Sequence, residues 1–436
     1  MKLKVPNTYV IIAAAILLCA VATWFVPGGE YVKAADGTLS YESVESVPQT
    51  WQVFSAIYHG FIKQAGIIVF IPVVGGAFWL LNATGAVEAG IRRFIARIGR
   101  KDRVVLIALT VLFSLAGAVF GMSEETIPFV GIVVPLCLSM GFDAFMGMLV
   151  VYVASNVGFS SAFLNPFTVG IAQGMADLPL FSGMGYRLFC WGVLTLGLCI
   201  FVAVYARKTK SETTAAEAVE SAPLTRRQTG VLLVLLLTVV ALVVGVTCFK
   251  WYMPEITALF LAMGIACGLI AGFGGSRIVD ELMAGAKDIL PAALVVGLAS
   301  GIIVILQDGK IIDSILHSME EGLDGSSGAA SLSAMYGIQA LINFVIPSAT
   351  AKAAITIPVM APFADLVGVS RQAMVLAFQF GDGFTNMVTP TSGVLVAALA
   401  MARIPYSQWV RWIWKMVAVL LVAGLLLLLP TLLVWG

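Results

Sequence analysis

The sequence predicts an all-α polytopic membrane protein built from two copies of one broken-helix pattern, and three observations lead to that prediction. Of the 436 residues, 60% are hydrophobic and only 11% are charged, too little charge to cover a soluble domain of this size. Apolar runs of about 20 residues, the length that spans a bilayer as a helix, recur along the chain. The chain also aligns with itself when it is shifted by 224 positions, as from Gly85 to Gly309.

The repeat predicts the division of the chain. The same shift places Thr126 on Thr350, and the order of apolar and polar segments is repeated with it. Two copies of a broken-helix pattern in a membrane chain are typical of secondary transporters. We expect a first transmembrane repeat over 1–206, a polar cytoplasmic linker over 207–228 and a second repeat over 229–436.

Positive charge orients the expected spans. Lys and Arg cluster after the run 66–84 and again in the linker, so both places belong in the cytoplasm, whereas the acidic segment 28–50 suits the outside. The N-terminus is then cytoplasmic, and the expected location is a bacterial inner membrane. The apolar runs lie at 7–26, 66–84, 104–122, 186–206, 229–248, 255–273, 289–307 and 413–435.

The number of crossings agrees with the sides assigned from positive charge only if two segments, 104–141 and 331–367, are re-entrant hairpins. Each hairpin is followed by a helix that crosses once and is broken in the middle, at 144–175 and 371–400. The second half has an additional span at 255–273, which inverts the membrane orientation of all the segments that follow it. We therefore expect two inverted repeats with about nine full spans and two hairpins, as alternating access requires.

Composition and spacing exclude several other classes. The net charge of +1 indicates no basic surface for nucleic acid, and the six cysteines show no metal or redox spacing. His59 and His317 lie far apart, and neither a HExxH nor a GxSxG motif is present. An intramembrane enzyme, which needs a nucleophile–base pair or metal ligands, is a remote alternative. No cofactor is expected. The expected partners are the lipid bilayer and a small-molecule substrate.

Polar residues interrupt both broken helices. Gly and Pro free backbone groups there, and such breaks are tolerated in lipid where they line a cavity. Hydroxyl and amide oxygens suit Na⁺, and exposed helix N-termini suit a carboxylate. The alternative is a packed polar patch between helices. The expected ion-binding residues, with Na⁺ as the one metal considered, are Ser155, Asn156, Gly158, Ser160, Asn165, Asp382, Thr385 and Thr391.

The hairpin tips carry charges that are costly at membrane depth unless they are paired or hydrated. Glu124 and Glu125 lie in the first tip, Lys352 in the second, and Asp382 in the second break. Lys352 either binds substrate or pairs with one of the glutamates. The expected substrate-binding residues are Ser123, Glu124, Glu125, Thr126, Asn156, Asn165, Ser348, Thr350, Lys352, Asp382, Asn386 and Thr389.

The charges of this expected cavity favour a substrate that carries a positive group. Three acids, Glu124, Glu125 and Asp382, oppose one base, Lys352. We expect a secondary active transporter that moves a small zwitterionic or basic amino acid, by exchange or by coupling to Na⁺ or H⁺. The alternative is a carrier of four-carbon dicarboxylates or other organic anions that travel with Na⁺ or H⁺.

Several motifs resemble those of one family. They are Gly121-Met122-Ser123-Glu124-Glu125-Thr126, Asn165-Pro166-Phe167-Thr168, Asp308-Gly309, Phe344-Val345-Ile346-Pro347-Ser348, Met360-Ala361-Pro362-Phe363-Ala364-Asp365 and Val388-Thr389-Pro390-Thr391-Ser392-Gly393. With them the chain resembles the YfcC family, dicarboxylate anaerobic carrier-like, of the ion transporter superfamily. The resemblance covers most of the chain and implies an inner-membrane secondary carrier that forms a homodimer.

The resemblance leaves the substrate open. Relatives include arginine/ornithine exchangers as well as four-carbon dicarboxylate carriers. The chain departs from the family pattern at Asp382, where a small neutral residue is expected, and at Lys352, where a small or apolar one is expected. Both departures lie at the proposed site.

Overall fold

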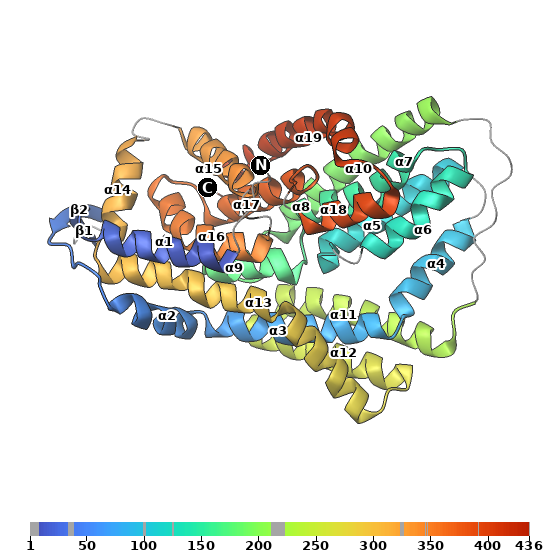
Figure 1. Ribbon diagram of the computed structural model, residues 1–436, viewed down its shortest axis with the longest axis horizontal. Coiled ribbons are helices and arrows are strands. Elements are labelled where there is room, and N and C mark those ends of the chain that lie inside the picture. The colour runs from blue at the N-terminus through green and yellow to red at the C-terminus, as the bar shows by residue number, and fades with distance from the viewer. Residues whose placement is uncertain are drawn as a thin grey trace.

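The fold is almost entirely helical, as predicted (Figure 1). A computed structural model describes residues 8–33, 39–98, 102–123, 126–210, 223–322, 327–344, 346, 348–390 and 392–435. The first half of the chain forms α1 (Thr8–Ala22), β1 (Gly28–Lys33), β2 (Leu39–Val44), α2 (Gln52–Lys63), α3 (Ala65–Ala83), α4 (Ala86–Ile98), α5 (Asp102–Phe120), α6 (Thr126–Ser139), α7 (Ala144–Met148), the π-helix η1 (Leu149–Val153), α8 (Ala154–Ser160), η2 (Pro166–Gly170), α9 (Ile171–Met175) and α10 (Met184–Thr209). The second half forms α11 (Arg226–Phe249), α12 (Met253–Ala271), α13 (Gly275–Asp308), α14 (Ile312–Gly322), α15 (Gly328–Ile342), α16 (Ala349–Leu366), α17 (Arg371–Asn386), α18 (Gly393–Ala402), α19 (Tyr406–Leu428) and α20 (Thr431–Val434).

The two halves repeat the same order of elements. The hairpin α5–α6 corresponds to α15–α16, and the broken segment α7–α9 corresponds to α17–α18. Contacts between the halves are reciprocal, since α6 packs against α18 and α9 packs against α16. In Figure 1, α4 lies at one end of the long axis and its counterpart α14 at the other. This is the arrangement that inverted repeats produce.

Seven helices within the described part of the chain are long and apolar enough to cross a membrane: α3, α5, α10, α11, α12, α13 and α19. The other apolar helices, including those of the broken segments, are shorter. The predicted count of nine spans requires α1 and both broken helices to cross the membrane as well. It also requires α5 to be a hairpin arm that does not cross. This count stays a prediction.

The structure differs from the sequence prediction in two places. The expected span 289–307 is continuous with the stretch before it, and together they form one helix of 34 residues, α13, with Pro291 inside it. Their counterparts in the first half, α2 and α3, stay separate at Gln64. The acidic segment 28–50, for which no regular structure was predicted, contains a two-stranded antiparallel sheet in which Tyr31 pairs with Tyr41.

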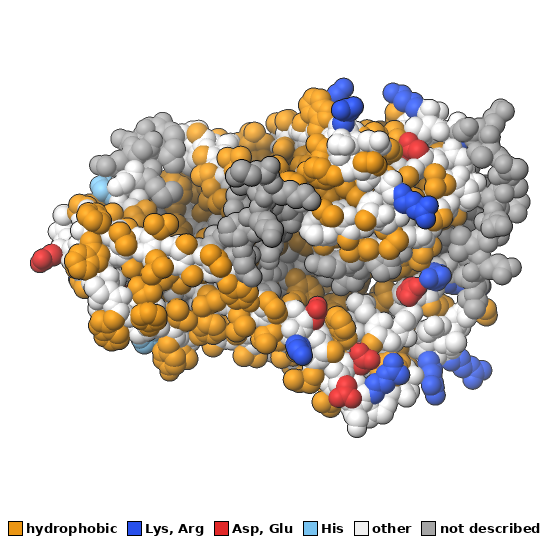
Figure 2. Space-filling model, viewed as in Figure 1, with side chains coloured by type: hydrophobic (Ala, Val, Ile, Leu, Met, Phe, Trp, Pro, Cys, Tyr) orange, Lys and Arg blue, Asp and Glu red, His pale blue; other side chains and the backbone are white. Residues whose placement is uncertain are grey.

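The helices form two layers (Figure 1). In one layer α13 packs along α2 and α3, and α12 packs on α3 and α11. The other layer contains both hairpins, both broken segments, α10 and α19. Figure 2 shows wide hydrophobic areas on the outer surface, with most visible Lys and Arg side chains toward the end where α4 lies. That distribution agrees with a cytoplasmic assignment of this end.

Candidate functional site

A cavity of about 1240 Å³ lies where the two layers meet. One wall contains residues of both hairpin tips and both broken segments, and the opposite wall belongs to α3 and α13. Five of the predicted substrate-binding residues line it, namely Ser123, Asn156, Ser348, Thr350 and Asn386. The structure therefore brings together the four segments that the sequence predicted to form the site.

Other predicted residues lie behind this wall. Thr126, Asn165, Lys352, Asp382 and Thr389 are buried and do not line the cavity. The same holds for the predicted ion ligands Ser155, Gly158, Ser160 and Thr385. Glu124, Glu125 and Thr391 lie outside the described residues.

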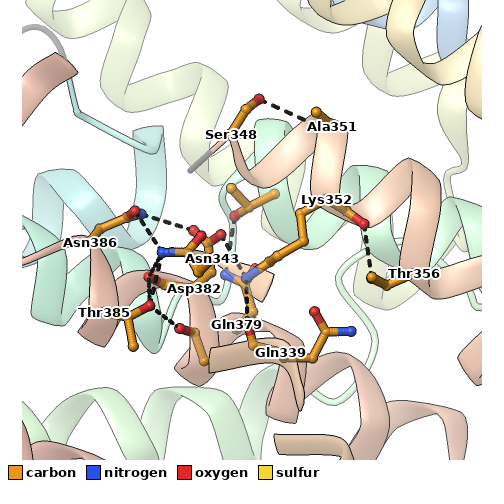
Figure 3. A network of polar contacts seen from close by, with 12 residues as sticks. Gln339, Asn343, Ser348, Ala351, Lys352, Thr356, Gln379, Asp382, Thr385 and Asn386 are labelled. Carbon is orange, nitrogen blue, oxygen red and sulfur yellow. Dashed lines mark hydrogen bonds and ion pairs between the residues drawn. The ribbon is translucent and has the colours of Figure 1, made fainter. Parts of the chain in front are cut away.

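Lys352 and Asp382 form a fully buried ion pair (Figure 3). Lys352 Nζ on α16 lies 2.9 Å from Asp382 Oδ1 on α17, and both side chains are 0% exposed. The sequence analysis left open whether Lys352 binds substrate or pairs with Glu124 or Glu125, and its partner is Asp382. Removing one member would leave an uncompensated buried charge, which costs on the order of 3–5 kcal/mol.

Amide side chains extend the ion pair into a network (Figure 3). Asn343 Nδ2 donates to Thr385 Oγ1 at 2.8 Å and to the Asp382 carbonyl oxygen at 3.2 Å. Asn386 Nδ2 donates to Asp382 Oδ2 at 3.1 Å, and Asn386 itself lines the cavity. Tyr152 of the first half donates to the Asn386 carbonyl oxygen at 3.0 Å. The buried pair is thus one residue away from the cavity surface.

Asn343 was missed by the sequence analysis, as were Gln339 and Gln379, which lie beside the pair. All three are buried amide residues: Gln339 lies on the apolar arm α15, Asn343 directly follows that helix, and Gln379 lies on α17. A buried amide between two apolar runs needs hydrogen-bond partners. Gln339 and Asn343, at the end of the first arm of the second hairpin, could therefore have been recognised in the sequence as buried polar residues.

The corresponding place in the first half is neutral and tightly packed. A Cβ added to Gly158 would lie 1.7 Å from the Ser114 carbonyl oxygen, and one added to Gly117 would lie 2.1 Å from the Ser155 carbonyl oxygen. These glycines allow α5 and α8 to approach closely. Gly158 therefore has a packing role, while Ser155 Oγ donates to the Met122 carbonyl oxygen at 2.5 Å and holds the first tip.

Two helix N-termini point their first residues at the cavity. Ser348 caps α16 by accepting a hydrogen bond from the Ala351 amide, and Ser392 caps α18 by accepting one from the Leu395 amide. The first residues of both helices line the cavity. Free amide groups and the helix dipole at such ends favour an anionic group.

The opposite wall is acidic. Glu281 and Asp288 line the cavity seven residues apart on α13, which places them on one helix face. No Lys, Arg or His lines the cavity in the part of the chain that the structure describes. Neither acid was predicted as a site residue, because both lie before the apolar run 289–307, outside the expected hairpins and broken helices.

A second cavity of about 360 Å³ lies at the far end of α16 and is lined in part by Asp177 and Arg371. Arg371 Nη2 lies 2.8 Å from Asp365 Oδ2 on α16. Its Nη1 donates to the Ala176 carbonyl oxygen at 2.8 Å and lies 3.3 Å from Asp177 Oδ2. Arg371 therefore ties the end of α9 in the first half to α16 and α17 in the second half.

Repeated halves with paired hairpins and broken helices around one internal cavity define a polytopic carrier of the secondary-transporter class. The chain belongs to the C4-dicarboxylate anaerobic carrier (DcuC) family, whose model matches residues 5–432. The family resemblance drawn from the tip and break motifs is confirmed, and membership in a transporter family implies a protein that is not an enzyme.

Two relatives match nearly the whole chain. The Escherichia coli protein named "Putative basic amino acid antiporter YfcC" is 34% identical over 93% of this chain and 92% of its own length. An uncharacterized protein from Haemophilus influenzae is 25% identical over 97% of this chain and 96% of its own length.

Two solved transporter structures share the fold. The YdaH transporter of Alcanivorax borkumensis matches with a TM-score of 0.78 at 16% identity, covering 97% of this chain and 98% of that one. Neisseria gonorrhoeae MtrF, described as illuminating a class of antimetabolite efflux pumps, matches with a TM-score of 0.80 at 16% identity, covering 98% of this chain and 95% of that one. At this identity the similarity shows the fold alone.

Proposed function

We propose that this carrier moves small amino acids, with basic ones preferred, by exchange through alternating access. Transport proceeds without covalent chemistry and draws on a gradient of a counter-substrate, of Na⁺ or of H⁺. The proposed location is a bacterial inner membrane with the N-terminus in the cytoplasm. The proposed assembly is a homodimer, as the family resemblance implies.

The acidic wall of the larger cavity carries this proposal. Glu281 and Asp288 face the cavity, and no basic side chain is among its described lining residues. Arg277 Nε, outside the lining, lies 3.7 Å from Glu281 Oε1 and offsets part of its charge, so the proposal depends mainly on Asp288. The positive charge of Lys352 is already balanced by Asp382. A negative wall attracts a substrate with one or two ammonium groups and repels a second carboxylate. The relative whose name refers to a basic amino acid antiporter supports the same class of substrate.

The cavity also offers a place for one carboxylate. The N-termini of α16 and α18 lie on the wall opposite α13, with Ser348 and Ser392 as their capping residues. A bound amino acid would direct its carboxylate to these amide groups and its ammonium groups to Glu281 and Asp288. This arrangement explains how one cavity accepts zwitterionic and basic amino acids.

A four-carbon dicarboxylate is the second candidate, because the family description refers to such carriers and two helix N-termini are available. Its second carboxylate would need a coupling cation to offset the acids on α13. Sodium-stimulated uptake of dicarboxylates would favour this candidate.

Counterflow in proteoliposomes tests the proposal. Purified protein is reconstituted with unlabelled arginine, ornithine, lysine, a neutral amino acid or succinate inside, and entry of labelled substrate is measured. We expect accelerated exchange among basic amino acids, slower exchange of neutral ones and none with succinate. If no amino acid is exchanged but succinate is, the dicarboxylate candidate replaces the amino-acid proposal.

A further inference from the structure

The buried ammonium group of Lys352 occupies the place where the sequence analysis expected a sodium ion. Asp382 and Thr385 in the second broken helix were predicted as ion ligands, and the cation found at Asp382 is Lys352 Nζ, at 2.9 Å. The same nitrogen is 3.5 Å from the Gln339 carbonyl oxygen and 4.8 Å from the centre of the Phe378 ring. A carboxylate, a carbonyl oxygen and an aromatic face all stabilise a cation.

Three amide side chains with oxygen acceptors belong to the residues that neighbour this ion pair (Figure 3). Asn343 Oδ1, Gln379 Oε1 and Gln339 Oε1 are buried and accept no hydrogen bond from any described residue. The orientation of two of these amides is fixed, because Asn343 Nδ2 and Gln379 Nε2 donate to backbone carbonyl oxygens at 3.2 and 3.0 Å. A buried group of oxygen atoms that contains a carboxylate requires a positive charge, and hard cations such as Na⁺ prefer such ligands.

The repeat shows that this charge pair belongs to one half only. The shift of 224 positions places Lys352 on Pro128 and Asp382 on Gly158, and both first-half residues are uncharged. Gly158 is held against the Ser114 carbonyl oxygen and leaves no space for a side chain. The carboxylate and its cation are therefore present together in the second half, and both are absent at the matching positions of the first.

We propose that Lys352 is a tethered substitute for a coupling sodium ion, so that this carrier exchanges its substrates without Na⁺. An ammonium group has the charge of Na⁺ but cannot leave the protein, and a fixed cation cannot draw energy from a sodium gradient. The transport consequence rests on the proposed function, whereas the cation site itself does not. The proposal also predicts that removal of the ammonium group exposes a functional Na⁺ site at Asp382.

Thermal unfolding of the full-length protein tests the cation site. Wild type, Lys352→Ala and Lys352→Ala/Asp382→Asn are each melted in NaCl and in choline chloride at equal ionic strength. We expect wild type to melt at the same temperature in both salts. Lys352→Ala is expected to gain a few degrees in NaCl, as binding to the folded state requires, and the double variant to gain nothing.

An exposed ion pair of the same length provides the matched control. Lys310 Nζ lies 2.9 Å from Glu30 Oε1, with side chains 43% and 47% exposed. Lys310→Ala should show no sodium response, since water already hydrates Glu30. If Lys352→Ala does not fold, Lys352→Met keeps the length of the side chain and is measured in the same two salts.

Two melting results overturn the proposal: a folded Lys352 variant that melts identically in both salts, or a wild type that is stabilised by Na⁺ but not by choline. Counterflow provides the second readout, in which wild-type exchange is expected to be equal with and without Na⁺. Sodium-dependent wild-type exchange contradicts the proposal. If no amino acid is exchanged but the melting shifts are as expected, the proposed function is wrong and the cation site is still supported.

Discussion

At the scale of single residues, charges that face the cavity differ in role from charges that lie behind its wall. Lys352 and Asp382 neutralise each other at 2.9 Å and are 0% exposed, so neither presents a net charge to substrate. Asp288 on α13 is exposed and lines the cavity, so it can meet a substrate without the cost of burying a charge. The proposed selectivity for positive groups therefore depends on α13.

Asp288→Asn should raise the apparent KM for arginine or lysine about tenfold, because an ionic hydrogen bond of roughly 1.5–3 kcal/mol is lost. Neutral amino acids should be affected less. The measurement is the concentration dependence of counterflow in proteoliposomes. Asp280→Asn is the matched control, since Asp280 is exposed on the same helix but does not line the cavity. Equal effects of both variants would contradict the role of Asp288.

Gly158→Ala should lower the melting temperature strongly, because the added Cβ would lie 1.7 Å from a backbone oxygen of α5. Overpacking of this kind costs about 1–3 kcal/mol or more. Gly337→Ala on α15 is the control, since a Cβ there meets nothing within 4 Å. It should be neutral or should stabilise by about 0.5–1 kcal/mol, as Ala does relative to Gly within a helix. Similar melting temperatures for the two variants would refute close packing at Gly158.

At the scale of elements, the halves differ most where the β1–β2 sheet takes the sequence place of α12. The sheet docks on the second half, since the Gly29 amide donates to the Lys310 carbonyl oxygen at 2.9 Å. The Tyr41 ring stacks on His317 of α14 at 4.0 Å between centroids, and its hydroxyl donates to Ser314 Oγ at 3.0 Å. A short sheet thus links the two repeats at the end of α13.

Tyr41→Ala should destabilise this link by about 1–2 kcal/mol, the combined order of a ring contact and a hydrogen bond. Thermal unfolding of the purified protein measures the effect. Tyr58→Ala serves as control, because Tyr58 is 65% exposed on α2. If the two substitutions lower the melting temperature equally, Tyr41 does not fix the sheet to α14.

At the scale of the whole molecule, the predicted crossing count determines which end of the carrier is expected to face the cytoplasm. The larger cavity is lined by Val87 of α4 and Leu235 of α11, near the basic end seen in Figure 2. We expect that end to be cytoplasmic. The end of α10 and the end of α13 should then lie on opposite sides of the membrane.

Cysteine labelling in cells tests this topology. In a variant without the six native cysteines, Lys208→Cys should react with an impermeant thiol reagent only after the membrane is opened. Lys310→Cys, at the end of α13, should react in intact cells. Labelling of both positions from the same side would contradict the additional crossing by α12 and with it the inverted orientation of the second half.

Much of the fold was predictable because membrane insertion imposes strong rules on length and apolar character. Both hairpins and both broken helices were predicted from the sequence, as was the meeting of their tips and breaks at one site. The partner of Lys352 did not, because it depends on how α16 and α17 rotate against each other. Glu281 and Asp288 were missed for a related reason: an amphipathic helix reads the same whether its polar face meets lipid headgroups or a cavity.

The tie made by Arg371 has a consequence for how often the carrier turns over. Its acidic partners are well exposed, at 87% for Asp177 and 50% for Asp365, and exposed ion pairs contribute only about 0.2–1 kcal/mol each. Two pairs of that strength together change the ratio of two conformations by at most about thirtyfold. The contacts of Arg371 therefore add only a small barrier to the separation of α9 from α16 and α17. The proposed exchanger must change conformation for every substrate, and a barrier of this size allows that change at ambient temperature.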